Sequence, residues 1–355
     1  MYDVIVVGAG PAGCSAARTL SEKGYRVLVA ERHKMPRYKS CSGILIRKSM
    51  ELIESYFGES VPDITTCLPP ENKGMIFTDD KGNESRFRQE GLNIWRSSLD
   101  SWLAEKAAEH GAEIRDHTAA VSCRETGEIA EVTFRDKDTY TEKAKYVVDC
   151  EGVTGTLKRR LTGISPGYIT TFQTFNEGKT DLDHHYFYAY FQPELSEYDA
   201  WFNVKDDLMV LGVSVRDTSR IEYFYKRFID YMKDRHGLRI DRQTKAEKWL
   251  MPRISPGCGI DHGRRRILFA GETAGFLNPM GEGISPGLES GHSAACAVAE
   301  HFGDPAEVLS CYRENTDQLE NYMKRQWDLV SRMSETFREM KSDDSCADGR
   351  SPEFL

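Results

Sequence analysis

The hydrophobic pattern changes twice within the first thirty residues, in a way that is typical of a strand, a helix and a second strand. Val4–Val7 is a continuous apolar run, the apolar residues of Cys14–Lys23 have helical spacing, and Val27–Ala30 is again continuously apolar. Strands that are apolar on both faces are typical of a parallel sheet covered by helices. We therefore predict a βαβ unit at the start of the chain.

The same two patterns return later in the chain. Ser98–Gly111 and Pro286–His301 have the spacing of helices, and Gly111 stands where the first of them should end. Lys145–Asp149 and Arg264–Gly271 have the pattern of buried strands. These segments predict further pieces of the domain that the βαβ unit begins.

Two stretches between these segments have a different hydrophobic pattern. Over residues 74–88 and 167–215, short runs alternate apolar and other residues, as at Tyr186, Tyr188 and Tyr190. Such alternation predicts half-buried antiparallel strands. We therefore predict an α/β fold in which a discontinuous Rossmann-like cofactor domain carries an inserted, mainly antiparallel β-sheet substrate domain and is followed by a helical C-terminus. The cofactor domain is predicted over 1–70, 93–165 and 250–302, the substrate domain over 71–92 and 166–249, the C-terminal helices over 303–342, and a disordered tail over 343–355.

Composition and charge exclude several classes of function. The 47 Lys and Arg residues against 56 Asp and Glu give a net charge of −9, which repels phosphate backbones, so we expect no nucleic-acid binding. The nine cysteines are scattered and never spaced C-x-x-C, and the histidines show no metal-ligand pattern, so we expect neither a disulfide framework nor a metal site. No run reaches the roughly 18 apolar residues of a membrane span, and no basic, hydrophobic leader is visible. A cytoplasmic protein is therefore expected.

A glycine turn joins the first predicted strand to the first predicted helix. Gly8 makes the tight turn, Gly10 lets the backbone approach a pyrophosphate, and Gly13 lets helix and sheet pack closely. The pyrophosphate then meets the helix N-terminus, whose free N–H groups and dipole favour an anion. Glu31 ends the next strand, 18 residues after Gly13, where its carboxylate can accept hydrogen bonds from ribose hydroxyls. The predicted dinucleotide site consists of Gly8, Gly10, Pro11, Ala12, Gly13, Glu31 and Arg32.

A second glycine-rich stretch decides which dinucleotide is expected. Leu268–Ile284 resembles the second FAD-binding motif of the p-hydroxybenzoate hydroxylase-like flavoproteins, a GD pair followed by P-x-x-G-x-G. Glu272 stands where that family has Asp, and only Met280 separates Pro279 from Gly281, one residue fewer than in the pattern. The resemblance implies non-covalent FAD, with the Glu272 carboxylate at the ribityl hydroxyls. It assigns to the cofactor Gly271, Glu272, Pro279, Gly281, Gly283 and Ile284.

Two shorter motifs resemble the same family. Arg96 opens an element that looks like R-x-x-L-D, which implies that its guanidinium approaches the FAD phosphate or ribose; alone, it could be a solvated arginine beside a helix N-cap. Residues 148–159 resemble a D-G-x-x-S-x-x-R element, but Glu151 replaces Asp, Gly155 replaces Ser and Lys158 replaces Arg. These departures weaken any role assigned there, including contact with a nicotinamide cofactor.

A loop around Cys41 indicates the branch within this family. Pro36–Leu45 is similar to the K-P-C-G-G-like loop of the geranylgeranyl reductases and the CbrA-like group, which lies over the flavin ring. Lys39, Cys41 and Gly43 match, whereas the two serines between them do not. The resemblance places Cys41 and Gly43 against FAD. It makes Cys41 the candidate catalytic residue, as a proton donor, with a redox reporter or a small buried hydrophobe as the alternatives.

Two aromatic residues of the predicted sheet domain are candidates for substrate binding. Tyr198 and Trp201 lie in a segment loosely similar to the Y-x-W-x-F-P signature of geranylgeranyl reductases, although the tyrosine is one place too early and no proline follows. Aromatic residues here could line an apolar substrate channel or simply pack a core. We expect Tyr198 and Trp201 to contact substrate.

The resemblance implies an FAD-dependent oxidoreductase that reduces C=C bonds of an isoprenoid or other hydrophobic substrate by hydride transfer from reduced FAD. NAD(P)H or another external electron donor is expected to act transiently, because Gly257-Cys258-Gly259 lacks the strand and the third glycine of a separate NAD(P) domain. An aromatic monooxygenase using NAD(P)H and oxygen shares the FAD motifs and is the first alternative. A non-catalytic flavoprotein is the second. A halogenase is disfavoured because its W-x-W-x-I-P element is missing.

A hydrophobic substrate also raises the question of a lipid surface. The net charge of −9 opposes binding to anionic membranes unless basic residues cluster locally. Lys158-Arg159-Arg160 is one such cluster, although a solvated helix face is the commoner meaning of such a run. A peripheral membrane contact is therefore an expectation of the sequence, whereas the oligomeric state is left open.

Overall fold

The strand β1 (Tyr2–Val7) runs through the middle of the first sheet, as its uninterrupted apolar sequence requires. It pairs in parallel with β2 (Val27–Ala30) on one side and with β9 (Thr139–Asp149) on the other. The helix α1 (Pro11–Glu22) connects β1 to β2. The predicted βαβ unit is confirmed.

The computed structural model describes residues 1–164, 167–253 and 260–342. The predicted disordered tail 343–355 and the Gly257–Gly259 segment lie outside these residues. Among the described residues, no helix combines the length and the apolar character needed to cross a bilayer.

The first sheet has eight strands, in the order β15-β16-β9-β1-β2-β6, with an antiparallel β7–β8 hairpin joined to β9. Helices α1, α3 and α6 pack together on it, which confirms the helices predicted near 98–111 and 286–301. The remaining strands are β6 (Glu113–Arg115), β7 (Ala119–Thr126), β8 (Ile129–Arg135), β15 (Gly263–Arg264) and β16 (Ile267–Phe269). The helices are α2 (Arg47–Phe57), α3 (Arg96–Glu109), α4 (Thr156–Thr162) and α6 (Ile284–Glu300).

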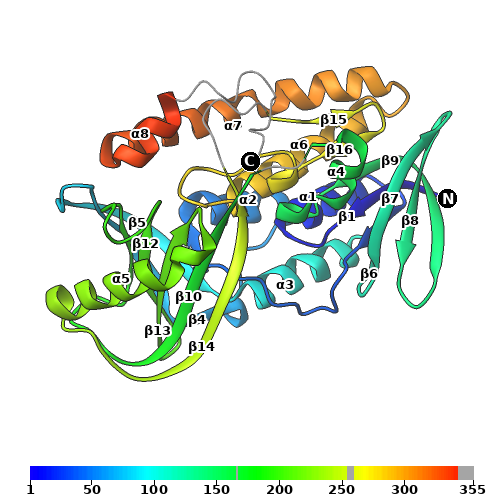
Figure 1. The fold of residues 1–355 in the computed structure, drawn as a ribbon. Helices are drawn as coiled ribbons and strands as arrows, with labels where there is room; N and C mark the ends of the chain where they lie inside the picture. Colours follow the sequence, from blue (N-terminus) through cyan, green and yellow to red (C-terminus); the bar gives the residue numbers. More distant parts are fainter. Residues whose placement is uncertain (165–166, 254–259, 343–355) are drawn as a thin grey trace.

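The second sheet also has eight strands, in the order β14-β10-β13-β12-β11-β4-β5-β3. Its neighbours are antiparallel except for β11 and β4, so the inserted, mainly antiparallel sheet is confirmed. It lies beside the first domain, in the lower left of Figure 1. The strands are β3 (Ile44–Ile46), β4 (Thr66–Thr78), β5 (Glu84–Ile94), β10 (Tyr168–Lys179), β11 (Tyr186–Tyr190), β12 (Ala200–Lys205), β13 (Leu208–Val215) and β14 (Arg239–Pro252).

The central strands of this second sheet, β11, β12 and β13, are covered on both faces, which differs from the half-buried strands that the alternation predicts. The helix α5 (Ile221–His236) packs on one face, where it buries Tyr186, Tyr188 and Tyr190. The alternate residues of β11, Phe187 and Ala189, face the other side, toward the C-terminal helices. The alternation on β11 therefore separates two buried environments instead of a core and a solvent face.

The C-terminal helices connect the two domains. α7 (Pro305–Met333) begins beside the first sheet, where the Asp304 carboxylate accepts hydrogen bonds from the first-turn N–H groups. It extends across the top of Figure 1 toward the second sheet, over which α8 (Glu335–Ser342) lies in red. Both are helical, as predicted for 303–342. They supply one wall of the space between the two sheets.

The close approach of α1 and α6 generates a first prediction. A Cβ at Gly291 would lie 2.1 Å from the carbonyl oxygen of Ala12, so α6 can pack this closely only with glycine there. Alanine is otherwise favoured over glycine inside a helix by about 1 kcal/mol. We expect Gly291→Ala nevertheless to lower the free energy of unfolding by about 1–3 kcal/mol, the usual cost of overpacking. Chemical denaturation measures this change in the free energy of unfolding.

The matched control is Gly303→Ala, since no described atom lies within 4 Å of a Cβ at that position. This control should change the free energy of unfolding by no more than about 0.5–1 kcal/mol, in the stabilising direction. An unchanged or raised stability of Gly291→Ala would contradict the close approach of the two helices.

Candidate functional site

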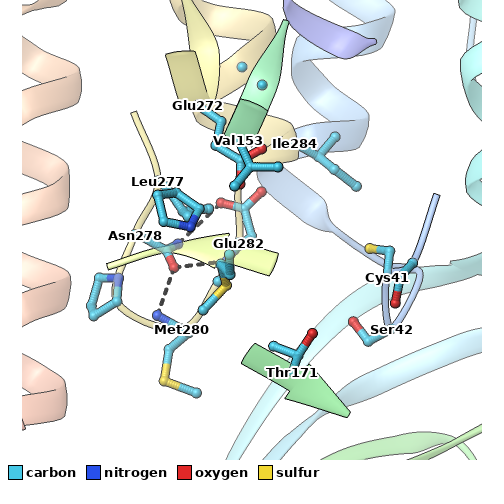
Figure 2. A pocket seen from close by; sticks show the side chains of 18 of the residues that line it. Cys41, Ser42, Val153, Thr171, Glu272, Leu277, Asn278, Met280, Glu282 and Ile284 are labelled. Carbon is cyan, nitrogen blue, oxygen red and sulfur yellow. Dashed lines mark hydrogen bonds between the residues drawn. The ribbon is translucent and has the colours of Figure 1, made fainter. Parts of the chain in front are cut away.

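A cavity of about 670 Å³ lies between the two sheets and the C-terminal helices. This volume is within the usual range for cofactor and ligand sites. Figure 2 shows the Asn278–Ile284 loop facing Cys41 and Ser42 across the cavity, with Thr171 of β10 between them. Most of the predicted site residues line this cavity: Gly8, Gly10, Pro11, Ala12, Glu31, Arg32, Cys41, Arg96, Tyr198, Trp201, Gly271, Glu272, Pro279, Gly281, Gly283 and Ile284.

Two predicted glycines lie behind the lining and not on it. A Cβ at Gly13 would lie 1.8 Å from the carbonyl oxygen of Gly8, so this glycine permits the tight turn. Gly43 has a φ of +76°, and a Cβ there would lie 2.0 Å from Nζ of Lys205 and 2.2 Å from the carbonyl oxygen of Ile94. Both residues shape the loops that carry the lining.

The N-terminus of α1 is open toward the cavity. Gly10 is its N-cap, and within the described residues no side chain caps this helix end. The only described atom within 4 Å of a Cβ at Gly10 would be Nη2 of Arg37, at 3.5 Å. Free N–H groups, the positive end of the helix dipole and an adjacent guanidinium make this a site for an anion such as a pyrophosphate.

A chain of buried charges connects this turn to Cys41. Arg37 pairs with Glu31 at 3.0 Å and with Asp100 at 3.0 Å. Asp100 in turn accepts two hydrogen bonds of 2.9 Å from Arg96, whose guanidinium lies close enough to the Cys41 sulfur for the two groups to interact. Burial alone would raise the pKa of Asp100, but the two guanidiniums outweigh it and hold that pKa below its usual range. Glu31, Arg37, Asp100, Arg96 and Cys41 therefore form one network, here called the acid–arginine network.

This network changes which arginine is expected to lie at the cofactor phosphate. Arg96 lines the cavity, but its guanidinium is engaged by Asp100 instead of projecting freely toward a phosphate. Arg37, which was not predicted, is likewise ion-paired, with Glu31 and Asp100, but its Nη2 also stands beside Gly10 at the glycine turn. The sequence feature that could have identified Arg37 is its position in the same loop as Cys41. Arg32 is more peripheral, with its Nη1 donating to Oγ1 of Thr154 at 3.2 Å.

The Cys41 loop is fixed by hydrogen bonds to the second sheet. The side-chain amide of Asn203 donates to the carbonyl oxygen of Ser42 at 3.1 Å. Lys205 is 1% exposed, donates to the carbonyl oxygen of Ile94 at 2.6 Å and lies behind Gly43. Burial lowers the pKa of Lys205. Both side chains come from one face of β12, so this strand positions the loop that carries Cys41.

The second glycine-rich loop is closed by its own side chains. Oδ1 of Asn278 accepts hydrogen bonds from the backbone N–H groups of Met280 and Glu282, at 3.0 and 3.1 Å (Figure 2). The Glu282 carboxylate accepts the N–H of Ser285 at 2.7 Å at the start of α6, and burial raises the pKa of Glu282. These bonds accommodate the loop that is one residue shorter than the family pattern. Glu272 lies 3.4 Å from Nζ of Lys39, across the cavity.

The rest of the cavity wall is mainly apolar and comes from the second sheet and α7–α8. Trp201 lies flat against its neighbour strand, because a Cβ at Gly212 would be 2.0 Å from the indole ring. Asp199 also lines this part, and burial raises the pKa of Asp199 to about 6. Sequence reasoning missed Asp199, although it lies between Tyr198 and Trp201. The other apolar and aromatic lining residues include Met75, Phe77, Phe87, Phe187, Phe191, Trp249 and Met251.

The family model described as "FAD binding domain" matches residues 1–247. The chain belongs to the FAD-binding domain family. It is an FAD-dependent oxidoreductase with the α/β architecture described above. The lining fits the cofactor: an open helix N-terminus and Arg37 suit a pyrophosphate, and the Glu31 and Glu272 carboxylates suit hydroxyls.

Individual relatives align with most of the chain. It is 28% identical over 351 residues to the digeranylgeranylglycerophospholipid reductase of Methanosarcina acetivorans, covering 92% of this chain and 80% of the relative. It is 24% identical over 352 residues to digeranylgeranylglycerophospholipid reductase 1 of Methanopyrus kandleri, covering 96% and 91%. The crystal structure of a geranylgeranyl bacteriochlorophyll reductase-like protein from Thermoplasma acidophilum has a TM-score of 0.80 at 17% identity, with coverage of 96% and 90%.

The role of Glu31 generates the second prediction. Its carboxylate lines the cavity, accepts hydrogen bonds from the N–H groups of Ala9 and His33 at 3.1 and 3.0 Å and pairs with Arg37 at 3.0 Å, which leaves about one of its four lone-pair sites for a cofactor hydroxyl. We expect Glu31→Ala to weaken FAD binding by about 1.5–3 kcal/mol, or roughly tenfold to more than a hundredfold in Kd. Titration of the FAD-free protein with FAD, followed by flavin fluorescence, measures the change.

Glu22→Ala is the control, because Glu22 is also an ion-paired glutamate of this domain but lies outside the cavity lining. It should bind FAD as the unaltered protein does. Equal FAD affinity in both variants would remove Glu31 from the cofactor site.

Proposed function

We propose that this protein reduces C=C bonds of an isoprenoid or another hydrophobic substrate. The observation that carries the proposal is the continuity of the cavity, whose apolar and aromatic wall joins directly to the lining that suits FAD. The two relatives named above are both reductases of a lipid with unsaturated chains by name, which supports the same reaction class. Bound and reduced, FAD supplies a hydride equivalent to such a reaction.

The chain's own residues hold the substrate and keep water away from it. Trp201 and Tyr198 contact the hydrocarbon chain, and the aromatic wall excludes water from the reacting carbons. One carbon of the double bond gains the hydride and the other gains a proton. Cys41 donates that proton, held in place by the hydrogen bonds that fix its loop. Solvent reprotonates Cys41 after each turnover.

The external electron donor is proposed to be NAD(P)H or a protein that replaces it. The sequence offers no second glycine motif in the context of a separate nicotinamide domain. The donor therefore acts transiently on the FAD domain. The same donor would serve the monooxygenase alternative, so the product decides between the two reactions.

We also infer a peripheral contact with a membrane, at a different place from the basic run of α4. Lys158 donates to the carbonyl oxygen of Thr273 at 2.9 Å, and Arg160 donates to the carbonyl oxygen of Val121, so two of its three cations are engaged within the protein. Tyr38, Leu250 and Leu329 are large, exposed hydrophobic residues that also line the cavity. An apolar rim of this kind suits a lipid surface from which a hydrophobic substrate enters.

Product analysis tests the reaction. Purified FAD-loaded protein is reduced without oxygen and incubated with a polyprenyl lipid, and the products are examined by mass spectrometry beside extracts of cells with and without the gene. We expect products that have gained pairs of hydrogen atoms, and none when the reductant is omitted. Products that gain oxygen when air is admitted would replace the reductase with a monooxygenase.

The role of Cys41 has its own test. Cys41→Ser should leave FAD affinity unchanged and slow turnover by roughly 10²–10⁴-fold, the usual contribution of a positioned general acid. Single-turnover oxidation of the reduced protein by substrate measures the rate. Cys67→Ser is the matched control, because Cys67 is a buried cysteine of the second sheet that does not line the cavity. Turnover equal to that of the unaltered protein would leave Cys41 a packing role and make Asp199 the next acid to replace.

A further inference from the structure

The apolar part of the cavity has a defined end, formed by the C-terminal helices. One wall of it consists of buried side chains from the last turns of α7 and from α8. These pack against Phe77 and Phe191 of the second sheet in a single hydrophobic cluster. The buried lining residues from the two helices are Trp327, Val330, Met333, Phe337 and Met340.

Phe337 occupies the centre of this end wall. Its ring lies 5.8 Å from the ring of Phe191, 6.3 Å from that of Tyr198 and 5.8 Å from that of Trp327. It is 4% exposed. The ring therefore spans the gap between the second sheet and α7, and Met280 of the second glycine-rich loop packs against the same cluster.

The end wall lies far from the loop that carries Cys41. Asn203 of β12 bonds to that loop, and Ala200 at the other end of the strand is three residues away, about 10 Å at the usual strand rise. Tyr198, whose ring packs against that of Phe337, lies two residues before Ala200 in the sequence. A hydrocarbon chain with one end at Cys41 would thus extend past Trp201 and meet Phe337.

The position of α8 is fixed by the turn between β4 and β5. Oδ2 of Asp80 accepts the first N–H of α8, from Glu335, at 3.0 Å. The N–H of Asp80 donates to the carbonyl oxygen of Met333, the last residue of α7, also at 3.0 Å. The joint between the two helices is therefore tied to the second sheet from both sides. Phe337 stands on an anchored helix.

We propose that Phe337, with Met340 beside it on α8, sets the longest hydrocarbon chain that the cavity accepts. The inference rests on the proposed function, since it assumes a hydrophobic chain in this cavity, and it adds a specificity residue that the FAD motifs do not contain. Each methylene buried before the chain reaches Phe337 lowers the Kd about fourfold. Methylenes beyond that point have no apolar surface to contact, so the gain in affinity stops there.

The experiment measures binding without turnover. The FAD-loaded protein is titrated by calorimetry with a homologous series of straight-chain alcohols, and the chain length at which affinity ceases to rise is recorded. Phe337→Ala should move this plateau to longer alcohols, with about a fourfold lower Kd for each additional methylene. Met340→Ala removes a smaller group and should move it less, and it serves as the second variant if Phe337→Ala does not fold.

Phe224→Ala is the matched control. Phe224 is a buried phenylalanine, 3% exposed, of α5, which packs on the opposite face of the second sheet, and it does not line the cavity. It should leave the plateau where it is in the unaltered protein. The same plateau in all variants would overturn the role of Phe337 and leave the proposed reaction standing. Failure of the unaltered protein to bind any alcohol of the series would overturn both.

Discussion

The buried carboxylate of Asp100 is the group on which the rest of the site depends. It is wholly enclosed on α3 and pairs with two guanidiniums, those of Arg37 and Arg96, while Glu31 supplies the second negative charge. Removing one partner of such a buried pair typically costs about 3–5 kcal/mol, because a charge is left without compensation. Arg37 belongs to the Cys41 loop and Arg96 contacts Cys41, so the acid of the first domain determines where that loop lies. The glycine turn and Cys41 are thereby parts of one electrostatic unit.

The second constraint is that the central strands of the substrate sheet, β11, β12 and β13, are covered on both faces. α5 packs on one side of them, whereas the other side must be apolar and yet remain partly empty. The chain meets this requirement with side chains from distant positions: the FAD domain supplies the two glycine-rich loops, and the C-terminal helices supply a wall of aromatic and sulfur-containing residues. The cavity is consequently complete only when the last helices of the chain are docked.

The sequence predicted those features that depend on local patterns. The βαβ unit, the helices near 98–111 and 286–301 and the glycine turn all follow from period, turn chemistry and motif spacing within short windows. It did not predict α5. Because α5 covers one face of β11, the alternate residues of this strand belong to two different hydrophobic clusters. Nor did it predict Arg37 or Asp199, because what distinguishes each is a partner or an enclosure created by residues far along the chain. Arg96 was predicted to approach FAD and lines the cavity, but its pairing with Asp100 could be seen only in the structure.

The flat indole of Trp201 links two positions that are eleven residues apart in the chain and directly opposite in the sheet. Any side chain at position 212 would occupy the volume of that ring. A lineage that gains a side chain at 212 must therefore give up tryptophan at 201, and with it part of the cavity wall. The residue types at positions 201 and 212 therefore indicate the shape of this part of the cavity in any related sequence, without a structure.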